Sequence, residues 1–505
     1  MLAPGKLFTR LKNALNPTRD VRYPDVQSAL EADTEFNTDN LNYRLLSLSP
    51  SDHVDVRMAV EGTLILGAIG SGKSSGSAAA YARAFLSAGY GGLICCCRQD
   101  ERRAWERYAA KTGRSDSLII VSPQGRYRCN PVDYLLKRPG TTASRIEQVV
   151  NFLSSIAEVA ERGDKGGGGK HDRFFEQTNK RAIRAVTEVC FRARGATGMA
   201  ILDEVMMSSP RTHEEVHDPA WQQRSLCYRM ITEGDAKPMT TQERVDFDRA
   251  AAFLLRDIPD MPPETRGSVF ATWGTMVDPL LRGQMAELFG TETNFIPELS
   301  FNGAVIVLDL STEVFGHYGA VLMAAFGYIW KLAVSQRDLD LYPRPVFWFC
   351  DEYAEVALRS DAKWLSVSAR HKRCCAVLIG QTTTGIQAAL GGDSAKDAAD
   401  NLFAALGTKI FHANSGATNR WASGLFARDW QVRTNFSASN GEHQNASGGG
   451  SDMLESTVLE SEFTRLKKGG PESNFCTEAI VFCGGKVWNA TGTTALRTIF
   501  RQHID

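Results

Sequence analysis

Short apolar runs recur along the chain and are separated by longer stretches of mixed polarity. These runs are apolar at consecutive positions rather than at every second one, which predicts strands that are buried on both faces. The predicted strands are 63–66, 92–97, 118–121, 304–308, 346–350, 376–379, 408–411 and 479–483. Strands of this kind occur in parallel sheets that helices cover on both sides, so the pattern predicts an α/β fold.

The interval 141–290 has a different pattern, with few strand candidates. Its apolar residues recur at helical spacing, for example at Ile146, Val149, Leu153 and Ile156. We therefore predict an inserted all-α domain at 141–290 and an α/β core that comprises 61–140 and 291–505.

Residues 1–60 form a lead-in to this core. Their first stretch, MLAPGKLFTRLKNALNP, has the spacing of a short basic amphipathic helix, which could dock on the protein itself or bind a membrane or a partner. Two polar, glycine-rich segments are expected to be mobile: GDKGGGGKHD from Gly163 and SASNGEHQNASGGGSD from Ser437.

Composition narrows the class of protein. The chain has 505 residues, of which 43% are hydrophobic and 23% charged, so it is globular and large enough for two or three domains. Its formal charge of −1 means that any nucleic-acid surface must be local. The eleven cysteines lack metal-ligand spacing and are expected to be reduced core thiols. We expect no stretch to be apolar over the length that spans a bilayer, and the start does not resemble a signal peptide.

The stretch LILGAIGSGKSSG, residues 64–76, carries the strongest chemical signal. Gly67, Gly72, Lys73 and Ser74 match the pattern G-x-x-x-x-G-K-[ST], and a predicted strand precedes them while a predicted helix follows. In this pattern backbone N–H groups surround phosphates, the lysine reaches the β and γ phosphates, and the serine hydroxyl binds Mg²⁺. The alternative is an ordinary glycine-rich turn. The predicted nucleotide-binding residues are Gly67, Ala68, Ile69, Gly70, Ser71, Gly72, Lys73, Ser74 and Ser75.

An acidic pair supplies the second half of the predicted site. PVFWFCDEYAEV places Asp351 and Glu352 directly after an apolar strand, where Asp351 could hold Mg²⁺ and Glu352 could polarise the attacking water. The alternative is a strand end with solvated carboxylates. Gln381 follows a later strand and could sense the γ phosphate.

These segments resemble a known family, the type IV secretion coupling proteins of bacterial conjugation (the TraG, TraD and TrwB group), within the FtsK and HerA class of RecA-like ATPases. The resemblance rests on LILGAIGSGKSSG, FWFCDEYAEV and SARHKRCCAVLIGQTTTGI, with weaker similarity at PQGRYRCNPVDYL, DRFFEQTNKRAI and NLFAALGTKIFHANSGATNRWAS. It implies a RecA-like P-loop NTPase core with a mostly parallel central sheet covered by helices, plus the inserted all-α domain.

The resemblance also implies roles for single residues. Lys73 and Ser74 would bind phosphates and Mg²⁺, Asp351 and Glu352 would serve hydrolysis, and Gln381 would sense the nucleotide. Arg370 would act as an arginine finger on the ATP of a neighbouring subunit, with Arg373 as the alternative donor and a surface salt bridge as the alternative role. The chain departs from the family where glycines usually follow this arginine, because it has His371, Lys372 and Arg373 there.

Three functions are compatible with these residues. The first is a hexameric ring-forming ATPase that translocates single- or double-stranded DNA; the second is a receptor for protein cargo; the third is a nucleotide-binding scaffold. Secretion or relaxosome proteins are possible partners. A cytoplasmic location is implied, with peripheral association at the inner face of a bacterial membrane as an alternative. The candidate basic groups for DNA are Arg98, Arg102, Arg103, Lys180, Arg181, Arg184, Arg465, Lys467 and Lys468, each of which could equally belong to a solvated face.

Overall fold

The structure is a computed structural model of the chain, and it describes residues 41–160, 173–195, 197–392, 394–426, 428–439 and 445–502. The amphipathic helix expected at the start of the chain and the glycine-rich segment from Gly163 lie outside these ranges. All eleven cysteines lie inside them and are free, and all except the half-buried Cys476 are buried, as expected of core thiols.

The eight predicted runs and β13 form one nine-stranded sheet, in the order β13-β12-β9-β3-β8-β7-β4-β6-β5. Strand β3 pairs in parallel with β8 and β9, and β6 pairs in parallel with β4 and β5. Strand β12 pairs antiparallel with β9 and β13. The bounds are β3 (Thr63–Leu66), β4 (Gly91–Cys96), β5 (Leu118–Val121), β6 (Val305–Asp309), β7 (Val346–Cys350), β8 (Cys374–Gly380), β9 (Thr408–Phe411), β12 (Cys476–Cys483) and β13 (Ala495–Arg501). The prediction of a mostly parallel sheet covered by helices is confirmed.

The chain divides into two compact units, which β7 shares. In the part of the chain that the structure describes, the first unit comprises Gly89–Phe347 and Glu355–Ser360. It contains β4, β5 and β6 together with the whole helical interval that follows β5. Because this unit joins strands and helices, the separate inserted domain at 141–290 stays a prediction.

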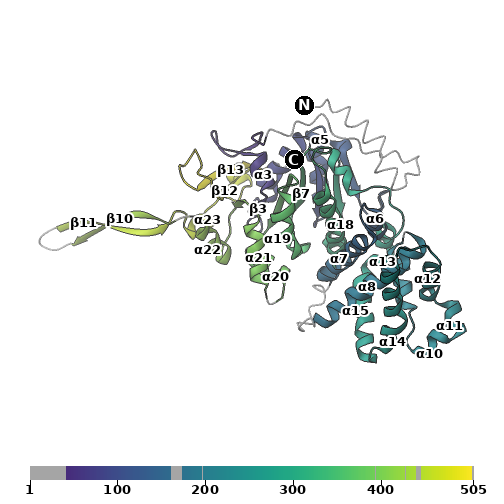
Figure 1. Cartoon of the computed structure of the whole chain (residues 1–505). Coiled ribbons are helices and arrows are strands. Elements are labelled where there is room, and N and C mark those ends of the chain that lie inside the picture. Colours follow the sequence, from purple (N-terminus) through teal and green to yellow (C-terminus); the bar gives the residue numbers. More distant parts are fainter. Residues whose placement is uncertain are drawn as a thin grey trace. The chain divides into compact units, whose positions relative to one another are not determined.

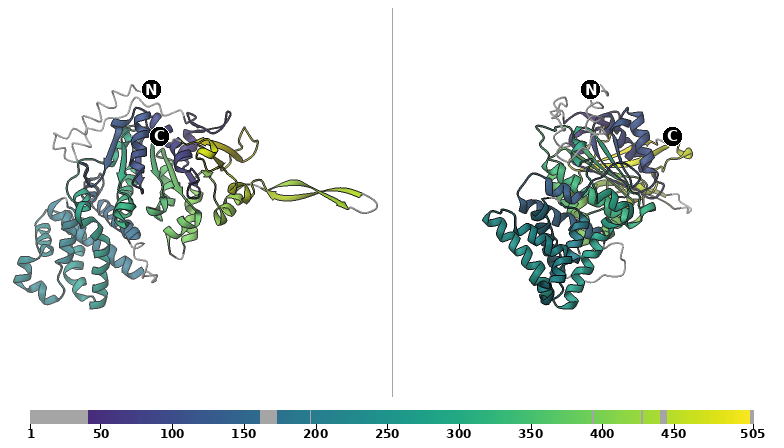
Figure 2. Two further views of the ribbon diagram at one scale, coloured as in Figure 1. Left: turned by 180° about the vertical axis from the view of Figure 1, so that it is seen from behind. Right: turned by 90° about the vertical axis from the view of Figure 1, so that its right-hand side faces the viewer.

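Helices fill most of the first unit. The periodic residues Ile146, Val149, Leu153 and Ile156 are all buried on α7, as their spacing predicts. Helix α8 packs against α7, α12 and α13 (Figures 1 and 2). The helices are α5 (Glu101–Lys111), η2 (Ser115–Ser117), α6 (Pro131–Lys137), α7 (Thr142–Ala160), α8 (Arg173–Arg194), α9 (Met199–Met207), α10 (His213–His217), α11 (Pro219–Arg224), α12 (Leu226–Asp235), α13 (Thr241–Ala252), η4 (Phe253–Asp257), α14 (Ile258–Asp260), α15 (Pro263–Leu281), α16 (Gly283–Phe289), η5 (Pro297–Asn302), α17 (Thr312–Phe315) and α18 (His317–Gln336).

Helix α18 differs from the expectation for the bilayer. It is long and apolar enough to cross a membrane by length and composition, and it is the one such helix among the residues described, whereas no such stretch was expected. Within the structure 78% of its apolar window is buried. A helix that is covered on several sides becomes apolar around its whole circumference, which gives it the composition of a membrane span.

The second unit comprises Thr38–Ala88, Trp348–Ala354 and Asp361–Asp505, within the described ranges. It contains β3, β8, β9, β12, β13 and the carboxyl end of β7. The small pair β1 (Arg44–Ser47) and β2 (His53–Asp55) lies at its start. The helices of this unit and of the segments that join it are α3 (Val56–Val60), η1 (Ser74–Ala78), α4 (Ala79–Ser87), η6 (Tyr353–Glu355), α19 (Ser360–Trp364), η7 (Leu365–Ala369), α20 (Thr383–Leu390), α21 (Ala395–Ala404), α22 (Gly416–Leu425), α23 (Glu460–Thr464) and η8 (Pro471–Ser473).

Part of the segment predicted to be mobile forms strands. The backbone around Ser437 forms the hairpin of β10 (Arg428–Ser439) and β11 (Asn445–Ser456), which Figure 1 draws as a long ribbon. Ser437 pairs with Ser447, and Phe436 pairs with Gly448. Antiparallel pairing needs only backbone groups, so a polar and glycine-rich sequence can adopt it without an apolar face.

Candidate nucleotide site

The turn after β3 has the geometry that its glycines predict. Gly70 and Gly72 have φ of 72° and 80°, values that side chains rarely allow. A Cβ atom at Gly72 would also lie 2.9 Å from the carbonyl oxygen of Lys468. At the base of the turn, Gly67 N–H donates to the Gly380 carbonyl and Ala68 N–H to the Ala413 carbonyl. The turn is therefore held between the ends of β8 and β9.

The polar residues of this turn are largely buried. Lys73 is only 5% exposed and Ser71 only 1%, whereas Ile69 is 79% exposed. The hydroxyl of Ser71 is buried and has no hydrogen-bond partner. A buried hydroxyl without a partner is costly in a folded protein, so Ser71 is a strained position within the turn.

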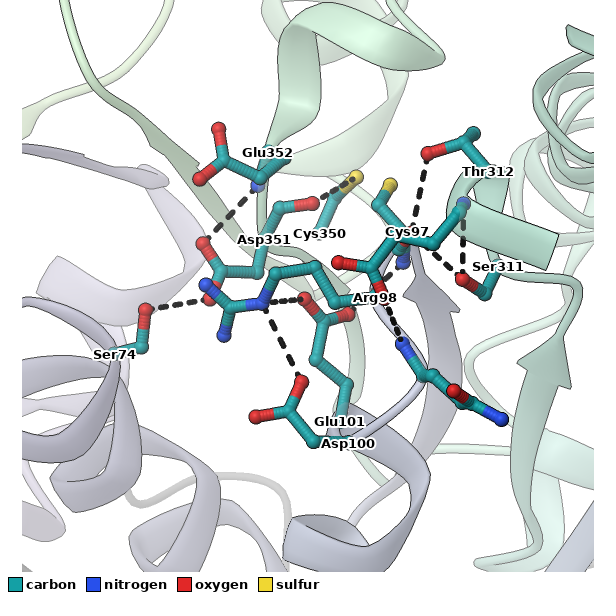
Figure 3. A network of polar contacts seen from close by, with 12 residues as sticks. Ser74, Cys97, Arg98, Asp100, Glu101, Ser311, Thr312, Cys350, Asp351 and Glu352 are labelled. Carbon is teal, nitrogen blue, oxygen red and sulfur yellow. Dashed lines mark hydrogen bonds and ion pairs between the residues drawn. The ribbon is translucent and has the colours of Figure 1, made fainter. Parts of the chain in front are cut away.

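The acidic pair meets this turn, although 277 positions separate Ser74 from Asp351. Strand β7 is buried throughout and ends at Cys350, so the next two residues emerge at its carboxyl end. The Ser74 hydroxyl donates to Asp351 Oδ2 at 2.6 Å, and the Glu352 N–H donates to Asp351 Oδ1 at 3.0 Å (Figure 3). The predicted Mg²⁺ ligands Ser74 and Asp351 are therefore adjacent.

Glu352 faces the lysine of the turn. Its φ is +53°, a left-handed conformation that costs about 1 kcal/mol for a residue with a side chain. Its Oε1 atom lies 3.8 Å from Lys73 Nζ and 3.3 Å from Gln381 Nε2. Gln381 directly follows β8, and its carbonyl accepts from Asn414 Nδ2 at 2.6 Å. The structure therefore brings Lys73, Glu352 and Gln381 to one place.

Arg370 lies elsewhere. It precedes β8, whereas Gln381 follows β8, and the seven residues of this strand span roughly 20 Å. Its guanidinium is 3.1 Å from the carboxylate of Glu61, which precedes β3, and its side chain is 60% exposed. The alternative donor Arg373 has a φ of 52°, a left-handed conformation that residues with a side chain rarely adopt. Arg370 therefore lies at the amino end of β8, whereas the site of its own chain lies at the carboxyl ends of the strands.

Several of the basic candidates for DNA are paired with carboxylates. Arg98 lies between Asp100 and Glu101 (Figure 3), and Arg102 pairs with Asp309 at 3.0 Å. Further pairs join Arg181 to Asp257, Arg184 to Glu147 and Lys467 to Glu478. These pairs lower the positive charge that each group presents, so the basic candidates do not by themselves define a nucleic-acid surface.

The residues fit a magnesium–nucleotide complex. Mg²⁺ prefers oxygen ligands and is commonly bound by one or two protein groups together with phosphates and water. The hydroxyl of Ser74 and the carboxylate of Asp351 are such ligands. Among the residues described, no cluster of three or more His, Cys, Asp or Glu side chains could hold a metal without further ligands.

Residues that the sequence did not single out surround the turn on the side of the C-terminal strands. The Thr477 hydroxyl donates to the Ser71 carbonyl at 2.9 Å, and the imidazole of His412 lies 2.7 Å from the Ser77 hydroxyl. No local motif marks these residues. They could have been found only from the order of the strands, because β9 and β12 bring them to the turn.

Solved structures of similar fold match this chain over most of its length. The bacterial conjugative coupling protein TrwBΔN70 in its unbound form matches with a TM-score of 0.55 and 15% identity over 92% of this chain and 90% of that chain. The chain has the fold of a conjugative coupling protein. TrwB with the GTP analogue GDPNP (TM-score 0.53, 15% identity, 92% of each chain) and TrwB with ADP and Mg²⁺ (0.55, 14%, 92% of this chain and 89% of that chain) match similarly.

This result confirms the sequence-based resemblance at the level of the fold. The coupling-protein fold contains the RecA-like P-loop core that the motifs predicted. No protein-family model and no curated protein matches the sequence.

Proposed function

We propose that the chain is an ATP-hydrolysing, ring-forming motor that moves DNA or nucleoprotein in conjugation or type IV secretion. The observation that carries the proposal is the convergence of Ser74 with Asp351 and of Lys73 with Glu352 and Gln381, at the carboxyl ends of β3, β7 and β8. The coupling-protein fold supports the choice of system, because TrwB is described as a conjugative coupling protein.

The binding half of the site follows from the phosphate turn. The N–H groups of residues 67–75 and the ammonium of Lys73 would hold the triphosphate, while Ser74 and Asp351 would hold Mg²⁺. When bound, Mg²⁺ would neutralise charge on the phosphate oxygens. TrwB has been solved with ADP and Mg²⁺ and with GDPNP, which supports nucleotide and Mg²⁺ binding by a protein of this fold.

The hydrolytic half follows from Glu352. A water oxygen would attack the γ phosphorus, and its proton would pass to the Glu352 carboxylate. The bond between the γ phosphorus and the β–γ bridging oxygen would break, and ADP would leave with the electron pair. Gln381, which is hydrogen-bonded to Glu352, would then register the loss of the γ phosphate through that carboxylate.

A second copy of the chain completes the proposed site. Arg370 is too far from the turn of its own chain, and its exposed side chain suits delivery to a neighbour. Turnover would then depend on assembly, as in a ring whose nucleotides lie between subunits. DNA in the channel would be gripped through its phosphates without base readout.

One experiment tests this proposal. The ATPase rate per subunit is measured against protein concentration, without DNA, with single-stranded DNA and with double-stranded DNA. We expect a steep rise with concentration and stimulation by DNA. A flat specific rate that ignores nucleic acid would contradict the motor; hydrolysis that responds to assembly but not to DNA would favour the protein-cargo receptor. Turnover equal to that of Glu352→Gln would favour the scaffold.

A further inference from the structure

The phosphate turn is backed by strand β12, which lies more than four hundred positions downstream. Thr477, the second residue of β12, is fully buried, and its hydroxyl is 2.9 Å from the Ser71 carbonyl and 3.1 Å from the Lys467 carbonyl. A Cβ atom placed on Gly76 would lie 2.4 Å from Thr477 Cγ2. The turn and the first turn of its helix therefore pack directly on this one threonine.

The contact at Ser71 fixes the direction of a phosphate-binding N–H group. In a planar trans peptide the carbonyl and the following N–H point in opposite directions. The carbonyl of Ser71 shares its peptide plane with the N–H of Gly72, the second glycine of the motif. When Thr477 holds this carbonyl toward β12, the Gly72 N–H must point away from β12, toward the concave side of the turn.

His412 extends the same set of hydrogen bonds. It follows β9 and is completely buried. Its Nδ1 is 3.1 Å from the Glu478 carbonyl, which can only accept, so Nδ1 carries the proton and Nε2 accepts from Ser77 Oγ at 2.7 Å. Nδ1 is also 3.3 Å from Thr477 Oγ1. Ser77 thus donates to His412, His412 donates to the carbonyl of Glu478, which follows Thr477 on β12, and Thr477 donates to the carbonyl of Ser71.

A third contact comes from the end of β13. Gln502 Nε2 donates to Ser75 Oγ at 2.8 Å, while Gln502 Oε1 accepts from the Gly470 N–H at 2.6 Å. Ser75 is the last residue of the predicted phosphate-binding set. Three residues on β12 or directly after β9 and β13 contact the turn or the helix that follows it. They are His412, Thr477 and Gln502, and we call them the C-terminal clamp.

We propose that the C-terminal clamp is a set of positioning residues that hold the N–H groups of the phosphate turn in their binding orientation. The inference rests on the proposed nucleotide site. It adds that residues of three strands far from the phosphate turn in sequence set the affinity of the turn for nucleotide. Preorganised donors bind a phosphate without having to be ordered first, so loss of the clamp should weaken nucleotide binding more than it slows the chemical step.

The test compares two threonines of the same sheet in the full-length chain. Thr477→Val removes the clamp hydroxyl and keeps the shape of the side chain. Thr498→Val is the matched control, because Thr498 on β13 is also buried and its hydroxyl donates to the Leu48 carbonyl, away from the turn. The readouts are the Kd of ADP with Mg²⁺ by calorimetry, the KM and kcat for ATP, and the midpoint of urea unfolding.

We expect Thr477→Val to raise the Kd and KM about tenfold with kcat changed less than about threefold. Thr498→Val should keep the wild-type Kd, and Thr477→Ser, which restores the hydroxyl, should recover most of the affinity. If Thr477→Val does not fold, Gln502→Ala at the end of β13 replaces it, with an expected rise in Kd of about threefold.

The outcomes separate the clamp from the site itself. Lys73→Ala should abolish binding of ADP with Mg²⁺. If it does, while Thr477→Val and Gln502→Ala bind as the wild type does, the clamp is overturned and the nucleotide site stands. If Thr477→Val and Thr498→Val weaken binding equally, the threonine is merely structural and the clamp is again overturned. If Lys73→Ala binds as the wild type does, the proposed function itself fails.

Discussion

The two ends of strands β3 and β8 carry different chemistry. At the carboxyl ends, Lys73 and Gln381 are directed at one carboxylate, and the side chain of Lys73 is only 6% exposed. At the amino ends, Glu61 and Arg370 form an ion pair on the surface, with 60% of the arginine side chain exposed. Buried groups that converge suit chemistry, whereas an exposed pair can separate at little cost. One end of these two strands therefore carries a buried, convergent set of groups, and the other end carries an exposed cation.

The greatest loss of ATP turnover is expected from a change at the carboxyl ends of the strands. Replacing Lys73 by Ala removes the ammonium beside Glu352, so we expect ATP turnover to fall by about 10³-fold or more. The rate of phosphate release is measured. Lys137→Ala is the control, because Lys137 is a surface lysine paired with Asp133, and it should retain wild-type turnover. Equal losses of turnover in both variants would show that Lys73 has no specific role.

A smaller loss of ATP turnover is expected from a change at the amino ends of the strands. Arg370→Ala should reduce turnover by about 10²-fold or more without weakening nucleotide binding by the same chain. Mixing Arg370→Ala with Lys73→Ala should restore part of the activity, because the second chain supplies the arginine and the first supplies the intact turn.

Two results would contradict this assignment. If the mixture is no more active than its separate components, Arg370 does not act on a neighbour, and Arg373→Ala is examined in the same way. If Arg181→Ala, which breaks another exposed ion pair, lowers turnover as much as Arg370→Ala, the effect is not specific to the amino ends of the strands.

The burial of His412 after β9 makes the free energy of unfolding depend on pH. Burial, with the nearby Lys73 charge, lowers the pKa of His412 to about 3, although its bond to the Glu478 carbonyl opposes the shift. Between that value and about 6.5 the unfolded chain binds a proton at His412 that the folded chain does not, so stability falls as the pH falls. From pH 7 to pH 5 this group should remove about 2 kcal/mol from the free energy of unfolding.

Urea unfolding of the wild type and of His412→Gln at pH 7 and pH 5 measures this contribution of His412 to the free energy of unfolding. The variant should be less stable at pH 7 and should lose less on acidification. An identical pH dependence in the two proteins would show that His412 is not held neutral.

The ion pair between Glu61 and Arg370 should contribute least to the free energy of unfolding. Glu61→Gln should change the free energy of unfolding by less than about 1 kcal/mol, because exposed pairs contribute little. Urea unfolding measures it. A loss of several kcal/mol would mean that the amino-end pair is a structural element rather than a surface contact.

Sequence reasoning predicted the parts of the fold and site that are contiguous. The runs TLIL and VFWFC are buried at every position, and the phosphate turn and the acidic pair follow them directly. Strand β13 was missed because it alternates buried Leu496 and Thr498 with exposed Arg497 and Ile499. Its partner β12 was predicted only in part, from 479, because its first residues are mixed in polarity.

The positions of Thr477, His412 and Gln502 at the turn were not predicted for a related reason. They contact the turn through strand order and pairing, and 406 positions separate Ser71 from Thr477. A single sequence carries no local pattern for such contacts, whereas a phosphate loop must place its donors within a few consecutive residues. The resemblance implied a role for Arg370 on a neighbouring subunit, and the parallel pairing of β3 with β8 gives its position at the amino ends of these strands.

The role of Glu352 in hydrolysis is decided by measuring ATP hydrolysis and ATP binding by Glu352→Gln and by the wild type at the same protein concentrations. Glutamine keeps the size of the side chain but cannot accept the proton of the attacking water, so we predict that binding of ATP with Mg²⁺ stays within about threefold while phosphate release falls by 10²-fold or more, that is about 3 kcal/mol in the barrier. Phosphate release at the wild-type rate by this variant would contradict the account.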